Sequence, residues 1–172
     1  MEAQAGDDGK PLREVQTDER RGFLAHKNVL YWLMRRGYPF QTTFIEYPDP
    51  AKLQEAEVVI LPFPLALTDD DPALVEQLTR DGKTVILLSE LSPLDEFGQT
   101  LAAPRLARLF GDSVPDLNTS EPVAHQLGKG QAVFLGDDAA LRLFEQIPPQ
   151  RSRAERVPLP DFAPDWTAKL EQ

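Results

Sequence analysis

The chain has 172 residues, which fits one folded domain, and 41% of them are hydrophobic, which suffices for a packed core. Its formal net charge of −10 leaves no basic stripe for nucleic acid, and the absence of cysteine excludes disulfides, thiolate metal sites and thiol nucleophiles. No apolar run reaches the roughly 20 residues of a membrane-spanning helix, so we expect no direct membrane insertion and a soluble, by default cytoplasmic, protein.

The N-terminal part predicts a loose polar segment over residues 1–19, in which the alternation from Leu12 to Thr17 indicates a short edge strand. Apolar residues at near-helical spacing then predict a helix from Leu24 to Arg36. Its last turn is basic and Gly37 follows as the C-cap, both of which are typical of a helix end.

Three short apolar segments predict strands in the first half of the chain. Thr42 to Tyr47 reads as a strand stopped by Pro48, and one helical turn is expected between Asp49 and Glu55. The runs Val58–Leu61 and Thr84–Leu88 are too short for helices and apolar throughout, which predicts buried parallel strands.

A helix is predicted between those two buried strands. Thr68, or one of the three aspartates that follow it, is expected to cap the helix, and Pro72 suits its first turn. Asp81-Gly82 ends it. The three aspartates Asp69–Asp71 could also hold a cation, but they lack the alternating spacing and glycine of a calcium loop.

The second half of the chain predicts a helix from Pro104 to Phe110, then an irregular stretch from Val114 to Gln126. Gly128–Gly130 reads as a hairpin or strand-entry turn into the strand Gln131–Leu135, and a helix is expected from Ala139 to Gln146. Residues 148–172 are rich in proline, and we expect an extended tail anchored by Phe162 and Trp166.

Alternating strands and helices are typical of right-handed βαβ units. We therefore expect an α/β domain over residues 20–147, with a flavodoxin-like three-layer sandwich and a mostly parallel sheet of about four or five strands.

One succession of elements is similar to the class I glutamine amidotransferase-like superfamily. The stretches that carry the resemblance are Leu33–Pro39, Ala56–Pro62, Leu67–Asp69, Asp81–Leu88 and Gly128–Gly136. Within this superfamily the chain most resembles non-catalytic branches, namely the middle domain of some β-galactosidases and a group of domains attached to bacterial membrane proteins. Active members carry a cysteine on a tight strand-to-helix turn and a later His-x-Glu pair, and this chain has neither, so glutamine hydrolysis is not expected.

Candidate site residues follow the predicted strands, at the edge where open α/β sheets bind ligands. Ser89 and Glu90 come directly after one strand, and Asp137 and Asp138 come after another. The two aspartates could hold Mg²⁺ through oxygen ligands, or Asp137 could simply cap the next helix. Ser89 would need a base such as His125 to act as a nucleophile, although no glycines flank it as in a nucleophile elbow.

Two functions remain open from the sequence. The first is a non-enzymatic interaction or ligand-binding module with a protein partner and without cofactor or metal, for which a link to a membrane-associated system is one option. The second is a hydrolase or carbohydrate-active accessory protein that uses carboxylates at the sheet edge, Glu90 and Asp137 first. Clustered aromatic side chains left exposed would indicate a protein-binding patch and favour the first; the candidates are Tyr31, Trp32, Tyr38, Phe40 and Phe63.

Overall fold

The computed structural model describes residues 12–45, 47–111, 114–137 and 139–140, with side chains from residue 21 onward. The predicted tail over 148–172, most of the expected helix over 139–146, and residues 1–11 lie outside this range. The elements in chain order are α1 (Leu12–Arg36), α2 (Pro50–Glu55), β1 (Val58–Pro62), α3 (Asp71–Arg80), β2 (Thr84–Leu88), the 3₁₀ helix η1 (Ala107–Phe110), β3 (Val123–Leu127) and β4 (Gly130–Leu135). Helical backbone resumes at residues 137, 139 and 140.

The four strands form one sheet in the order β1-β2-β4-β3. β1 pairs with β2 and β2 pairs with β4 in parallel, whereas β3 pairs with β4 antiparallel. The predicted α/β class is thus confirmed, but the sheet is mixed rather than mostly parallel. The cause is local: the turn at Gly128-Lys129 joins β3 and β4 as a hairpin, which forces antiparallel pairing.

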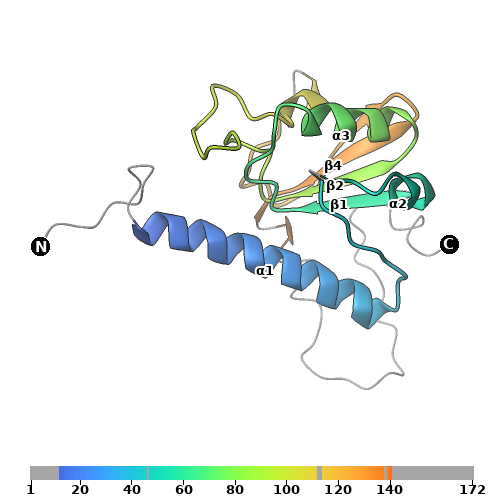
Figure 1. Cartoon of the computed structure of the whole chain (residues 1–172), viewed down its shortest axis with the longest axis horizontal. Coiled ribbons are helices and arrows are strands. Elements are labelled where there is room, and N and C mark those ends of the chain that lie inside the picture. The colour runs from blue at the N-terminus through green and yellow to red at the C-terminus, as the bar shows by residue number, and fades with distance from the viewer. Residues whose placement is uncertain (1–11, 46, 112–113, 138, 141–172) are drawn as a thin grey trace, which may run out of the picture.

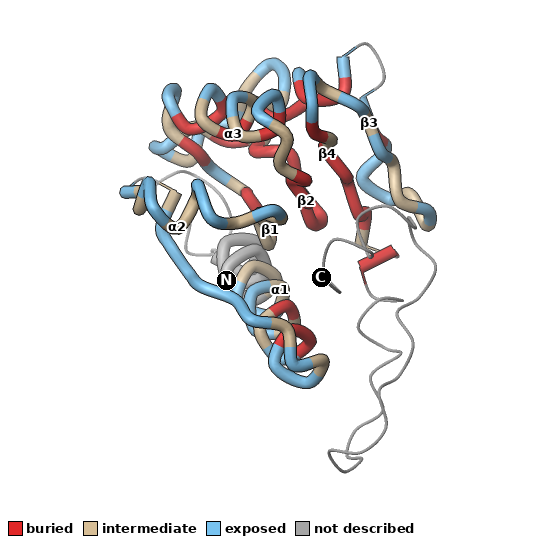
Figure 2. The backbone as a smooth tube through the Cα atoms, turned by 90° about the vertical axis from the view of Figure 1, so that its right-hand side faces the viewer, coloured by how far each residue is buried: buried red, intermediate tan, exposed pale blue. Residues whose placement is uncertain are grey.

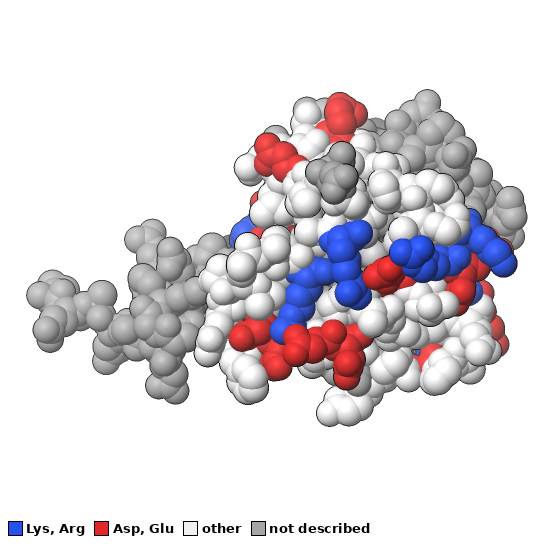
Figure 3. Space-filling view, turned by 90° about the horizontal axis from the view of Figure 1, so that it is seen from above, with Lys and Arg blue, Asp and Glu red and all other residues white. Residues whose placement is uncertain are grey.

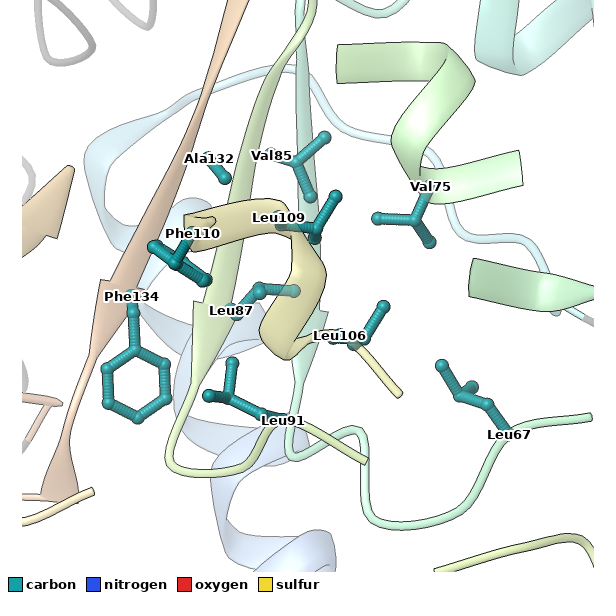
Figure 4. Packing of buried hydrophobic residues seen from close by; sticks show 10 residues of the cluster. All are labelled: Leu67, Val75, Val85, Leu87, Leu91, Leu106, Leu109, Phe110, Ala132 and Phe134. Carbon is teal, nitrogen blue, oxygen red and sulfur yellow. The ribbon is translucent and has the colours of Figure 1, made fainter. Parts of the chain in front are cut away.

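Helices cover both faces of the sheet (Figure 1). Because successive side chains of a strand point to opposite faces, each strand contributes to two cores. One core lies under α1 and contains Ile86, Leu88, Val133 and Leu135 from the central strands. The other lies under α3 and η1 and is filled by Val85, Leu87, Ala132 and Phe134 among others (Figure 4). Figure 2 shows the buried central strands β2 and β4 between these layers.

Helix α1 confirms the predicted helix and extends it towards the N-terminus. The predicted edge strand over Leu12 to Thr17 is wrong, because α1 already begins at Leu12. Leu, Arg, Glu and Gln in that stretch are strong helix formers, and six alternating residues do not outweigh them. Further along, Trp32 and Leu33 follow Val29 by one helical turn, and the three side chains bury one side of α1 against the sheet.

The predicted strand from Thr42 to Tyr47 is also wrong. Its described residues, 42–45 and 47, form no strand, and Phe44 and Tyr47 expose 77% and 85% of their surface. Its polar groups bond locally to the start of α2, since Thr43 Oγ1 accepts from the Asp49 N–H and the Thr42 carbonyl accepts from Lys52 Nζ. β1 is consequently an edge strand, and all five of its residues are only partly buried, so the prediction that Val58–Leu61 is a buried strand is wrong in that respect. The helical turn expected between Asp49 and Glu55 is confirmed as α2.

The region before β4 differs from prediction in two places. The helix expected from Pro104 is only the short η1, because the N–H groups of Arg105 and Leu106 donate to the loop carbonyls of Ser92 and Leu91. The stretch expected to be irregular ends in strand β3, whose alternating half-buried and exposed residues show the period of a one-sided strand. The turn at Gly128–Gly130 is confirmed.

Candidate functional site

The parallel strands β1, β2 and β4 end in register at one edge of the sheet. Pro62 lies opposite Leu88, and Leu88 lies opposite Leu135. The residues that follow these strand ends therefore lie side by side, where ligand sites of open α/β sheets form. They include the predicted residues Ser89 and Glu90 after β2, together with Asp137 after β4.

Ser89 lies on a tight turn at the end of the central strand β2. Its φ of 67° is in the left-handed region, its N–H donates to the Leu135 carbonyl at 2.8 Å, and the next N–H, of Glu90, donates back to Leu88. Phe63 and Ser92 at the same edge also have φ near 60°. Such conformations cost non-glycine residues about 1–3 kcal/mol each and persist where the surrounding structure imposes them. No residue type signals this strain in advance, since none of the three is a glycine.

Glu90 and Asp137 are brought together by Arg21 of α1. Arg21 Nη2 lies 2.7 Å from Asp137 Oδ2, and Nη1 lies 3.6 Å from Glu90 Oε1. The Glu90 side chain is only 10% exposed, whereas Arg21 and Asp137 are partly open to solvent. The guanidinium also lies 5.0 Å from the centre of the Phe63 ring. One arginine thus links the ends of β1, β2 and β4 to α1.

Asp137 does not have the expected N-cap role. The Gly136 carbonyl accepts from the Ala140 N–H at 2.8 Å, so Gly136 is at the cap position and Asp137 belongs to the first helical turn. Its carboxylate is used by Arg21 instead. Asp138, the other predicted ligand, lies outside the described residues.

A loop of the chain closes the end of β4. A Cβ at Gly136 would lie 2.5 Å from the Leu117 carbonyl oxygen and 2.6 Å from that of Thr119, and the Asp137 N–H donates to the Leu117 carbonyl. The glycine is therefore required by contact with residues 117–119. The space above β4 is filled by protein backbone.

His125 is not part of this cluster. It lies on β3 opposite Ala132, three residues before Leu135, which neighbours Ser89. That register separates His125 from Ser89 by roughly 10 Å along the strands and roughly 10 Å across them. Its ring instead packs near Phe110, with ring centres 6.5 Å apart. His125 is therefore not placed to act as the base that Ser89 would need, because β3 is a sheet edge on the far side of β4.

The carboxylates of Asp69 and Asp71 are also committed to protein partners. Asp69 and Glu96 both contact Arg105, at 2.6 and 3.2 Å, and Asp71 Oδ2 accepts from both the N–H and the hydroxyl of Thr68 at 2.8 Å. Acidic and basic side chains lie side by side on this face of the molecule (Figure 3). Within the part of the chain that the structure describes, no three His, Cys, Asp or Glu side chains are grouped to hold a metal ion.

None of the described helices combines the length and apolar character needed to cross a membrane. No protein-family model matches the sequence, and a search of curated proteins finds no match either.

Proposed function

We propose that this chain is a non-enzymatic interaction or ligand-binding module on a degenerate glutamine amidotransferase-like, flavodoxin-like fold, and that it works within a larger assembly with a protein partner. Two observations support the fold comparison: helices lie on both faces of the sheet, and two of its three strand pairings are parallel. The link to a membrane-associated system belongs to the same proposal.

The observation that carries this proposal is the position of Arg21. At the edge where a catalyst would act, the guanidinium from α1 contacts both candidate carboxylates and lies over Phe63. Both candidate carboxylates are thus already engaged by a cation of the protein itself. His125, the base considered for Ser89, lies on β3 and away from it.

The alternative, a hydrolase or carbohydrate-active accessory protein, is favoured by one specific observation. Three of the four weak catalytic candidates, Ser89, Glu90 and Asp137, do gather at this edge, and Ser89 has the left-handed φ of a residue held on a tight turn. That geometry is what presents a nucleophile at the top of a strand.

Covalent labelling separates the two functions for the serine. The full chain is incubated with a fluorophosphonate, which phosphonylates activated serines, and the products are read by intact mass and peptide mapping. We expect no adduct at Ser89. Ser92→Ala is the control, because Ser92 shares the left-handed φ and is buried. An adduct that Ser89→Ala abolishes and Ser92→Ala retains would establish the hydrolase instead.

The carboxylates need a separate assay. Chromogenic glycosides and esters are offered to the full chain and to Glu90→Gln and Asp137→Asn. We expect turnover at the rate of the buffer for all three proteins. Turnover by the unmodified chain that either substitution removes would replace the module with the carboxylate hydrolase.

A further inference from the structure

Helix α1 has apolar residues on two opposite sides. Phe23 and Trp32 are nine residues apart, which at 100° per residue is half a turn, so they face opposite directions. Trp32 is buried against the sheet, whereas Phe23 exposes 66% of its surface. The exposed side also carries Leu24, Tyr31 and Met34, which are 40%, 51% and 61% exposed. A helix that is apolar on both sides is typically covered on both.

We name this exposed side, made of Phe23, Leu24, Lys27, Tyr31 and Met34, the outer face of α1. It is basic as well as apolar. Lys27 Nζ lies 5.5 Å from the centre of the Tyr31 ring.

The charge of this part of α1 is opposite to that of the chain. Residues 22–34, which include the whole outer face, contain Lys27 and neither aspartate nor glutamate, although the whole chain has a formal charge of −10. An occupant of matching chemistry is therefore acidic, bears aromatic or aliphatic side chains, and is extended enough to run along a helix.

The chain itself contains a segment of that chemistry. Residues 157–166 read Val-Pro-Leu-Pro-Asp-Phe-Ala-Pro-Asp-Trp, with two aspartates and no basic residue. Proline-spaced apolar segments favour the polyproline II conformation, and proteins recognise them on aromatic surfaces at low entropic cost. Residues 157–166 lie outside the described part of the chain.

We infer that residues 157–166 bind the outer face of α1. Phe162 and Trp166 would contact Phe23, Tyr31 and Met34, and the aspartates would lie near Lys27. The inference rests on the proposed interaction module, because it assigns that module a surface and the occupant that covers it.

The chain is long enough for this contact. Ala140, the last described residue, is buried in the core under α1 beside Val29 and Trp32. Residues 141–156 separate it from Val157 and span up to about 50 Å when extended. Helix α1 is about 37 Å long at 1.5 Å per residue. Every point of the outer face is within reach.

Two other occupants fit the charges less well. A second copy that packs its own α1 on this face would bring basic residues against basic residues. An anionic membrane would attract the outer face but repel the rest of a chain with a net charge of −10.

A peptide experiment tests the inference on the full chain. The receptor is the full chain carrying Phe162→Ser and Trp166→Ser, so that its own segment no longer competes. The probe is a fluorescein-labelled peptide with the sequence of residues 157–166, and binding is followed by fluorescence anisotropy. We expect binding to this receptor, and at least 10-fold weaker binding to the unmodified chain, whose own segment occupies the face.

Matched variants locate the binding surface. Adding Tyr31→Glu to the receptor should weaken binding at least 10-fold. Adding Phe97→Glu, at an aromatic residue that is 77% exposed elsewhere, should leave binding unchanged. Circular dichroism confirms that both variants fold.

Three results would overturn the inference. The first is absence of peptide binding to the double-serine receptor. The second is binding of the chain to phosphatidylserine vesicles that Tyr31→Glu abolishes, without peptide binding, which would assign the face to a membrane. The third is a concentration-dependent dimer that Tyr31→Glu dissociates, which would assign it to a second copy. None of these results depends on the labelling of Ser89, so failure here and failure of the proposed function are distinguishable.

Discussion

Arg21 and Asp137 form an ion pair of 2.7 Å although 116 positions separate them in the sequence. The pair joins the N-terminal helix α1 to the residue two positions after β4. The buried Glu90 carboxylate lies next to the same guanidinium. The arginine therefore contacts two carboxylates in different environments: that of Asp137 is partly exposed and that of Glu90 is buried.

Substitutions at these positions should differ in cost. Asp137→Asn should lower the free energy of unfolding by only about 0.2–1 kcal/mol, because a partly exposed ion pair is screened by solvent. Arg21→Met should cost more, about 1–3 kcal/mol, because it removes a cation from a buried carboxylate. Urea unfolding measures both. Lys27→Met is the control, since Lys27 has no carboxylate partner among the described residues; equal costs for Arg21→Met and Lys27→Met would contradict the role of Arg21.

Ser89 offers a test of backbone strain. Because its φ is 67°, Ser89→Gly should stabilise the protein by about 0.5–1 kcal/mol, the relief of strain outweighing the entropy gained by the unfolded chain. Ser89→Ala keeps the Cβ and should give no such gain. Thermal unfolding of the two variants gives the comparison, and a more stable alanine variant would show that φ is not the source of the effect.

Gly130 at the start of β4 should tolerate no side chain. A Cβ there would lie 2.2 Å from the Lys83 carbonyl oxygen and 2.3 Å from that of Thr79. These are backbone atoms, so Gly130→Ala must displace either the hairpin or the end of α3, at a cost we place at about 2–4 kcal/mol. Gly98→Ala is the comparison without a clash: its φ of 79° is unfavourable for alanine, but nothing lies within 4 Å of its Cβ position. It should cost about 1 kcal/mol, and calorimetry that ranks the two variants in the opposite order would refute the packing argument.

Asp70 and Asp71, at the start of α3, should contribute differently to the stability of the protein. Asp70 occupies the cap position but its side chain makes no capping hydrogen bond, whereas the buried Asp71 accepts two hydrogen bonds from Thr68. Asp71→Ala should therefore destabilise the protein by about 1–3 kcal/mol, and Asp70→Ala should be nearly neutral. Guanidinium unfolding checks the ranking. Mg²⁺ should not raise the melting temperature of the unmodified chain, because the Asp71 carboxylate already accepts hydrogen bonds from Thr68. A rise that Asp71→Ala removes would instead identify a metal site.

Local patterns predicted those parts of the fold whose partners are close or whose environment is uniform. Val58–Leu61, Thr84–Leu88 and Gln131–Leu135 are mostly apolar, and all three are strands; β2 and β4 are largely buried in the middle of the sheet, whereas β1 is a partly buried edge. Thr42–Tyr47 has equally strand-like residues but its groups bond to the start of α2, and no spacing in the sequence reveals that competition.

The sequence predicted where the candidate site lies but not all of the residues that form it. The strand ends located Ser89, Glu90 and Asp137, whereas Arg21 was missed because its contacts depend on how α1 crosses the sheet. One signal was present: Arg21 is eleven residues before the buried Trp32, a spacing that returns to the same side of a helix. A charged residue on the buried side of a helix needs an acidic partner.

The core under α1 has a consequence for synthesis of the chain. Val29, Trp32 and Leu33 pack with Leu135, Ala139 and Ala140, so α1 is synthesised about 100 residues before the partners that complete its core. The β3–β4 hairpin, by contrast, closes over a turn of a few residues. Nascent α1 therefore exposes both of its apolar sides for about 100 residues of elongation, which takes roughly 5–20 s at bacterial and eukaryotic rates.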